Sequence, residues 1–121
     1  RLDEHGDMFR FFKEMIAFRK AHPAISRSHF WRDDVCWFGP DGPVDLSPSS
    51  RSLAFHSRGR SLGDGDLCVL INASCDPVPF YIQPSAPGRW RKVIDTSAES
   101  PHDISNEAHQ GAERDVVANA V

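Results

Sequence analysis

The adjacent aspartates Asp33 and Asp34 are the first residues in which to look for chemistry. Glycoside hydrolysis needs two carboxyl groups that converge at about 5–9.5 Å around the scissile bond, one as the acid and the other as the nucleophile or base. Successive side chains of a strand point to opposite faces, so sequence neighbours rarely reach that geometry. We therefore expect Asp33 and Asp34 to act as loop caps or ion-pair partners, and we assign no catalytic residue to this chain.

Aromatic rings flank these aspartates at Phe30-Trp31 and Trp37-Phe38. The apolar face of a sugar ring stacks on indole, while a carboxylate accepts hydrogen bonds from sugar hydroxyls. Trp31, Asp34 and Trp37 are therefore the candidate residues for binding a sugar. The alternative interpretation of both indoles is packing in the core or against another domain.

The three cysteines, Cys36, Cys68 and Cys75, do not have the spacing of a metal site. Cys68 and Cys75 lack the second CxxC or HxxxH motif that would complete four zinc ligands. An odd number of cysteines in a chain without a secretory signal favours reduced thiols and a cytoplasmic setting. We therefore expect no metal site, and we expect Cys68 to be a small core side chain in an apolar strand.

Two further motifs fall short of a functional site. His102-Asp103 and His109 lie in a polar segment without a nucleophile at a recognisable spacing. The glycine-containing segment 59–65 lacks the Lys-Ser/Thr pair and the following helix of a phosphate-binding loop. We therefore expect no cofactor.

The elements that must position these residues begin with an amphipathic helix between His5 and His22. Apolar residues recur there at three-and-four spacing, which places them on one helix face. These residues are Met8, Phe11, Phe12, Met15 and Ile16. Asp7 is the expected N-cap, and Pro23 ends the helix because the residue before a proline is driven out of the α region.

Arg19 falls near the middle of that apolar face, where a cation is unexpected. One interpretation is that its side chain reaches solvent at the last turn, where positive charge suits the helix C-terminus. The other is that Arg19 is buried and forms an ion pair with Asp33 or Asp34, because a desolvated guanidinium needs a carboxylate.

Beyond Pro23 the pattern is typical of short β-strands separated by Gly, Pro, Ser and Asp. The predicted strands are 35–38, 52–57, 67–73, 78–83 and 90–95, with a weak last one at 116–121. Strands of this number and spacing indicate an antiparallel β-sandwich or barrel. Residues 96–115 are predicted to form a long surface loop or a crossing connection.

Length and charge exclude several classes of protein. The chain has 121 residues, whereas a (β/α)₈ barrel needs about 250. A formal net charge of −3 gives no basic surface for nucleic acid or for an anionic membrane. No apolar run approaches the about 20 residues of a transmembrane helix. We therefore expect no nucleic acid and no membrane among its partners.

Several segments, in order and at matching intervals, resemble a known enzyme family. Residues 12–24 (FKEMIAFRKAHPA) are similar to the last barrel helix of α-amylase-superfamily enzymes. The following segments resemble the C-terminal region of isoamylase-type glycogen debranching enzymes. They are Phe30-Trp31, 34–42 (DVCWFGPDG), 51–55 (RSLAF), 70–73 (LINA) and 90–96 (WRKVIDT).

The resemblance implies a parent enzyme that hydrolyses α-1,6-glucosidic branch linkages of glycogen or a related glucan by a retaining mechanism. Its catalytic carboxylates would lie upstream of Arg1, and no position here matches them. Residues 1–24 would be the last helix of the catalytic barrel, and residues 25–121 a non-catalytic C-terminal β-sandwich whose last strand could be truncated.

The upstream barrel would thus be the main partner of this chain. Without the barrel, the apolar helix face must dock on the sandwich, self-associate or stay exposed. The competing function is a glucan-binding module that uses the surface tryptophans.

Overall fold

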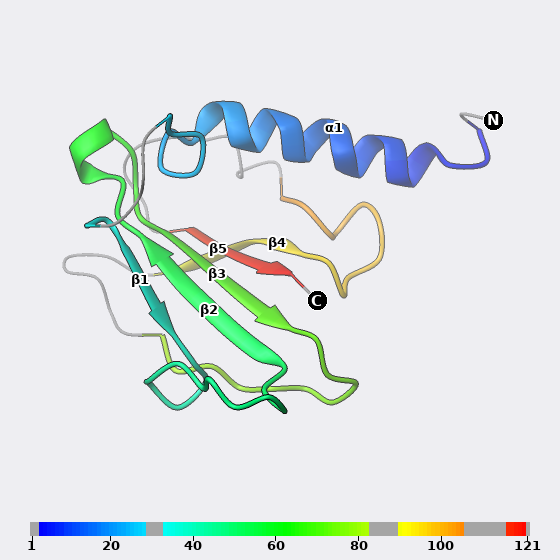
Figure 1. Cartoon of the computed structure of the whole chain (residues 1–121). Coiled ribbons are helices and arrows are strands. Elements are labelled where there is room, and N and C mark those ends of the chain that lie inside the picture. The colour runs from blue at the N-terminus through cyan, green and yellow to red at the C-terminus, as the bar shows by residue number, and fades with distance from the viewer. Residues whose placement is uncertain (1–2, 29–32, 83–89, 106–115, 121) are drawn as a thin grey trace.

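The computed structural model describes residues 3–28, 33–82, 90–105 and 116–120, the last of these as a backbone strand (Figure 1). One long helix lies across a β-sheet. The elements in chain order are α1 (Gly6–Ala21), β1 (Val35–Phe38), β2 (Ser52–Ser57), a 3₁₀ turn η1 (Arg60–Leu62), β3 (Leu67–Asn72), β4 (Arg91–Asp95) and β5 (Val116–Ala120).

Helix α1 begins and ends within one residue of the predicted range. Its N-cap is His5, without a side-chain capping bond, so the prediction of Asp7 as the N-cap is wrong. Asp7 instead lies in the first turn and accepts a hydrogen bond from the hydroxyl of Ser100. A carboxylate at this place still stabilises the helix, because it faces the positive end of the helix dipole.

The strands form one five-stranded sheet in the order β1-β2-β3-β5-β4. Strands β1, β2 and β3 are antiparallel neighbours, whereas β5 pairs in parallel with both β3 and β4. The prediction of a β-rich chain with one N-terminal helix is confirmed. The expected sandwich is not: the described strands form a single sheet, in which β5 lies between β3 and β4 and is parallel to both. The 20 residues between β4 and β5 are enough for the crossover connection that two parallel strands need.

The strand predicted at 78–83 does not form over residues 78–82, and Gln83 lies outside the described residues. Pro77 and Pro79 explain the difference, because proline has no N–H to donate to a strand ladder. The backbone N–H of Tyr81 instead donates to the carbonyl oxygen of Pro40, at 3.1 Å.

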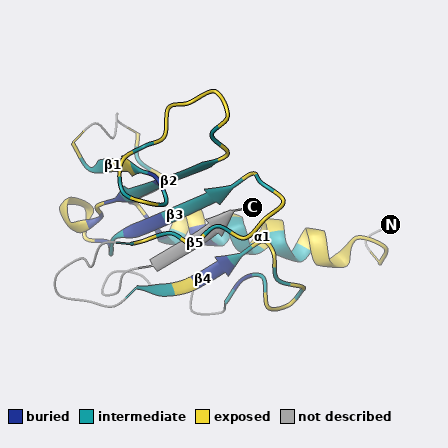
Figure 2. Ribbon diagram, turned by 90° about the horizontal axis from the view of Figure 1, so that it is seen from below, coloured by how far each residue is buried: buried dark blue, intermediate teal, exposed yellow. Residues whose placement is uncertain are grey.

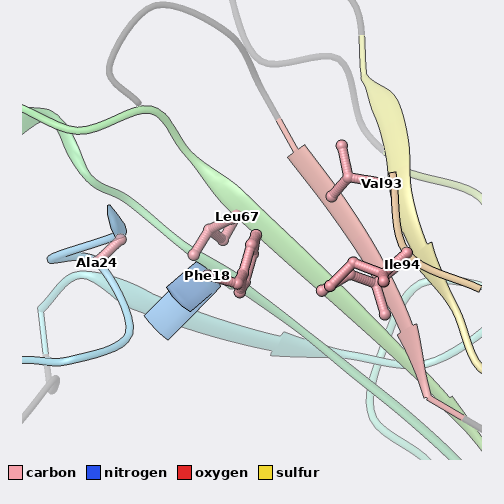
Figure 3. Close-up of a cluster of buried hydrophobic side chains, with 6 residues drawn as sticks. Phe18, Ala24, Leu67, Val93 and Ile94 are labelled. Carbon is pink, nitrogen blue, oxygen red and sulfur yellow. The ribbon is translucent and has the colours of Figure 1, made fainter. Parts of the chain in front are cut away.

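The hydrophobic core joins the helix to the sheet (Figure 3). Phe18 is its largest fully buried side chain, and Phe11 and Met15 pack against the cluster from the same helix. The cluster consists of Phe18, Ala24, Leu67, Val93, Ile94 and Ile104. Val93 and Ile94 are both buried although they are neighbours in β4, because the pairing register shifts between Lys92 and Ile94, as in a β-bulge.

Candidate functional site

The turn that follows α1 is held by a buried polar cluster. His22 and Asp64 face each other with a distance of 3.1 Å from Nδ1 to Oδ1. The other carboxylate oxygen of Asp64 accepts a hydrogen bond from the backbone N–H of Ala24, and the hydroxyl of Ser57 donates to the Ala24 carbonyl oxygen at 2.9 Å. The fold therefore gathers a serine, a histidine and an aspartate around Ala24.

This cluster is structural rather than catalytic. Ser57 is fully buried and directs its proton to a backbone carbonyl, so its oxygen is not available to a substrate. Burial raises the pKa of Asp64, but the hydrogen bonds from His22 and from the N–H groups of Ala24 and Gly65 outweigh it and lower the pKa below the ordinary value. Asp64 is thus an ionised anchor that fixes the end of α1 to the turn before β3.

Arg27 forms a second network beside the first. Its guanidinium donates to the carboxylate of Asp34, to the hydroxyl of Ser57 and to the carbonyl oxygens of Ala24 and Arg58. The hydrogen bond from Arg27 is the largest cause that lowers the pKa of Asp34, with further contributions from the positive charges of Arg27 and Arg58 that exceed the effect of burial. Asp34 therefore joins the turn after α1 to the start of β1.

Of the two interpretations left open for Arg19, the structure favours exposure to solvent over a buried ion pair. Arg19 is exposed in the last turn of α1, and Asp34 is bound by Arg27 instead. The helix turns Arg19 away from the sheet, whereas Arg27 lies in the turn that packs against the end of β2. Asp33 is exposed.

The two candidate tryptophans have different outcomes. Trp31 lies outside the described residues. Trp37 lies on β1 at the edge of the sheet with 54% of its surface exposed, and its ring packs against Phe55 with 5.1 Å between the centroids. One face of this indole is therefore covered by the neighbouring strand, while much of the rest is open. Asp34 is committed to Arg27, so its carboxylate is already engaged by protein.

Helix α1 has a second apolar stripe that does not touch the core. Met8, Phe9, Phe12 and Ile16 are exposed large side chains, whereas Phe11, Met15 and Phe18 face the sheet. At about 100° per residue the exposed stripe lies directly beside the buried one, and Arg19 falls within it. Figure 2 shows that much of the helix, especially toward its N-terminus, is exposed.

The described residues contain no group of three or more His, Cys, Asp or Glu side chains placed to hold a metal ion. Burial raises the pKa of the Cys68 thiol to about 12, which agrees with the prediction that Cys68 is a core side chain. Within the same part of the chain, no helix has both the length and the apolarity needed to cross a bilayer.

Sequence patterns alone did not reveal the anchors of the post-helix turn. Asp64 lies in the glycine-containing segment 59–65, to which the sequence assigned no site, and Arg27 and Ser57 lie in segments without a recognisable motif. The contacts of Asp64 span 42 residues to His22 and 40 residues to Ala24. A charged residue two to four positions after a helix-ending proline would be a usable signal in retrospect, since it can cap freed carbonyl groups.

Known proteins similar to this chain are isoamylases. Isoamylase 3, chloroplastic, of Oryza sativa subsp. japonica is 36% identical over 112 residues, which cover 86% of this chain. The isoamylase of Pseudomonas amyloderamosa is 32% identical over 101 residues, which cover 77% of this chain. This chain is a relative of the isoamylases. The resemblance noted from the sequence is therefore confirmed.

The relationship concerns a small part of each isoamylase. The match covers 13% of the rice and Pseudomonas proteins and 15% of the isoamylase of Flavobacterium sp, which is 28% identical over 119 residues. No protein-family model matches the chain, and no solved structure matches it significantly.

Proposed function

We propose that this chain is the C-terminal β-domain of an isoamylase-type debranching enzyme, preceded by the last helix of the catalytic barrel. In this proposal the parent enzyme hydrolyses α-1,6 branch linkages of glycogen or a related α-glucan, and residues 1–24 belong to the barrel while residues 25–121 form the appended domain. The chain itself is non-catalytic and supports the barrel. The similarity to isoamylases over most of this chain supports the assignment.

The exposed apolar stripe of α1 is the main observation in favour of a role in supporting the catalytic barrel. Met8, Phe12 and Ile16 are each more than half exposed, although the adjacent side of the same helix packs on the sheet. Contiguous exposed apolar residues mark surfaces that bind another protein surface. A helix whose apolar surface continues beyond its contact with the sheet suits a position between the sheet and an upstream barrel.

An activity assay tests the catalytic part of this proposal. The purified chain is incubated with glycogen, and new reducing ends are measured. We expect no release of linear chains, because in this proposal the catalytic carboxylates belong to the upstream barrel. Measurable debranching by this chain would overturn its non-catalytic assignment.

Charge substitutions on α1 test the docking part. Phe12→Glu with Ile16→Glu should lower the melting temperature and activity of the longer enzyme that carries this segment. Lys13→Glu, on the polar side of the same helix, is the matched control and should leave both near wild type. In the separate chain the stripe should cause self-association in sedimentation experiments, and the double variant should be monomeric. A wild-type chain that stays strictly monomeric with this stripe in solvent would count against the docking role.

A glucan-binding module is the second proposed function, and the exposure of Trp37 favours it. Binding of maltooligosaccharide by calorimetry, lost in Trp37→Ala or Trp31→Ala, is the expected result under this alternative. The cytoplasmic location remains a prediction from the cysteines, while the rice relative is a chloroplastic isoamylase.

A further inference from the structure

A cavity of about 420 Å³ lies beside the edge strand β1, on the sheet face opposite α1. Ser57 and Leu67 lie on the face of the sheet that α1 covers. Because side chains alternate along a strand, Cys36, Phe38 and His56 point to the other face. The cavity is lined by Cys36, Phe38, His56, Arg58, Tyr81 and Ile82, together with the turn before residue 44. Its volume falls within the about 300–1,000 Å³ that is usual for small-molecule sites.

The imidazole of His56 is held in place before any ligand arrives. His56 Nε2 lies 2.7 Å from Oδ2 of Asp66, and Oδ1 of Asp66 accepts a hydrogen bond from the backbone N–H of Gly59. The His56 ring also packs against Trp90 in a T-shaped arrangement, with 5.2 Å between the centroids. A fixed donor or acceptor loses less entropy on binding than a mobile one.

Tyr81 presents an open aromatic surface at the mouth of the cavity. Its side chain is exposed, with 70% of the residue accessible, while its backbone N–H is tied to the Pro40 carbonyl oxygen. Arg58 is placed in a similar way, because its backbone N–H donates to the carbonyl oxygen of Asp34 at 2.8 Å. The cavity therefore combines a ring face with side-chain donors on a fixed backbone.

The charges around the cavity favour a neutral ligand. His56 faces the carboxylate of Asp66, and Arg58 lies close enough to Asp34 to act on its ionisation. Both basic groups thus have a carboxylate nearby, which reduces the attraction for a phosphate or another anion. Aromatic rings with a few fixed polar groups are the usual lining of a site for hydroxylated ring compounds.

We propose that this cavity binds a short α-1,4-linked glucan chain, with one sugar ring stacked on Tyr81 and its hydroxyls hydrogen-bonded to His56 and Arg58. The choice of an α-glucan among hydroxylated ligands rests on the proposed function. The site is distinct from the Trp37 surface, because Trp37 and the cavity residues Cys36 and Phe38 lie on opposite faces of β1. A glucan chain held here would be bound away from the catalytic residues expected upstream.

Calorimetry with maltohexaose on the purified chain tests the site. Tyr81→Ala should weaken binding by about tenfold, because it removes the stacking surface. Tyr81→Phe keeps the ring and should bind within about threefold of wild type. Both changes are at an exposed position, so a dispersed NMR spectrum should show that each variant remains folded. Leu46→Ala truncates an exposed apolar side chain that does not line the cavity, so it is the control and should bind as wild type does.

Three results would overturn the proposal. They are no binding of maltohexaose to the folded wild type, equal binding of the β-linked cellohexaose, and loss of binding in Trp37→Ala with Tyr81→Ala unaffected. Debranching by the longer enzyme is a separate measurement: if it persists while maltohexaose does not bind the cavity, this site fails and the proposed function stands. If the longer enzyme has no debranching activity, the proposed function fails whatever the chain binds.

Discussion

The imidazole Nδ1 of His22 lies 3.1 Å from Oδ1 of Asp64, and both side chains are 1% exposed. His22 is the residue at which α1 ends, and Asp64 lies in the turn that leads into β3. The same carboxylate accepts hydrogen bonds from the backbone N–H groups of Ala24 and Gly65. One buried anion thereby connects two segments that are far apart in the chain, the end of α1 and the turn before β3.

Acidification should release this anchor. The pKa of Asp64 is lower in the folded chain than its ordinary value of 3.8, so the ionised form contributes stability above that value. This contribution should be lost as the pH falls from about 3.8 through the lowered folded pKa. In Asp64→Asn the free energy of unfolding at neutral pH should fall by about 1–3 kcal/mol, and its decrease in acid should be shallower.

Urea unfolding between pH 7 and pH 2.5 measures the effect. Asp41→Asn, which removes an exposed turn carboxylate, is the control and should follow the wild-type acid profile. An unchanged acid profile in Asp64→Asn would show that Asp64 does not stabilise the fold through its charge.

Two phenylalanines on α1 should contribute very different amounts to the free energy of unfolding. Phe18 is 1% exposed in the core, whereas Phe12 is 60% exposed on the outer stripe. Phe18→Ala removes buried apolar surface and leaves a cavity, so we expect a loss of about 3–5 kcal/mol in the free energy of unfolding. Phe12→Ala should change it by about 0.5 kcal/mol or less. Similar losses for both variants in thermal or urea unfolding would contradict the orientation of the helix.

The three thiols should differ in reactivity. Cys36 and Cys75 are exposed, whereas Cys68 is buried and its pKa is raised to about 12 by burial. Iodoacetamide at pH 8 should therefore modify Cys36 and Cys75 in the folded chain, and Cys68 only after denaturation, because the thiolate is the reactive form. Peptide mass spectrometry distinguishes the sites. Rapid alkylation of Cys68 under native conditions would show that β3 is more open than its burial indicates.

Local sequence patterns predicted the helix and most of the strands. Strands β1 and β2 have the predicted boundaries, and β3, β4 and β5 end within one residue of them. These segments are short, apolar or alternating, and bounded by turn residues, so local preference and burial agree. The strand predicted at 78–83 is wrong. The apolar residues there favour a strand, but Pro77 and Pro79 cannot donate the N–H groups that a strand ladder needs.

The sequence patterns did not predict which distant segments pair with each other. Strand β5 lies between β3 and β4 and is parallel to both. This position depends on how residues 96–115 connect the strands, and hydrophobic periodicity does not predict such a connection. One interpretation paired Arg19 with Asp33 or Asp34 because of its place on the helix face, but Arg27 reaches Asp34 from the turn. The direction of a long side chain after a helix ends is set by tertiary packing. The His56 and Tyr81 cavity likewise depends on contacts between segments that carry no common motif.

Substitutions at two glycines test whether close backbone packing stabilises the turn that contains Asp64. A Cβ atom on Gly59 would lie 2.1 Å from the backbone oxygen of Gly65 and 2.9 Å from Asp64, so Gly59→Ala must displace the backbone around the anchor. We expect it to lower the free energy of unfolding by about 1–3 kcal/mol. Gly6→Ala, at the start of α1 with nothing within 4 Å, is the control and should be neutral or stabilise the chain by up to about 1 kcal/mol. Thermal unfolding of both variants measures the difference, and a Gly59→Ala variant as stable as wild type would mean that the close approach of Gly59 to Gly65 does not hold this turn.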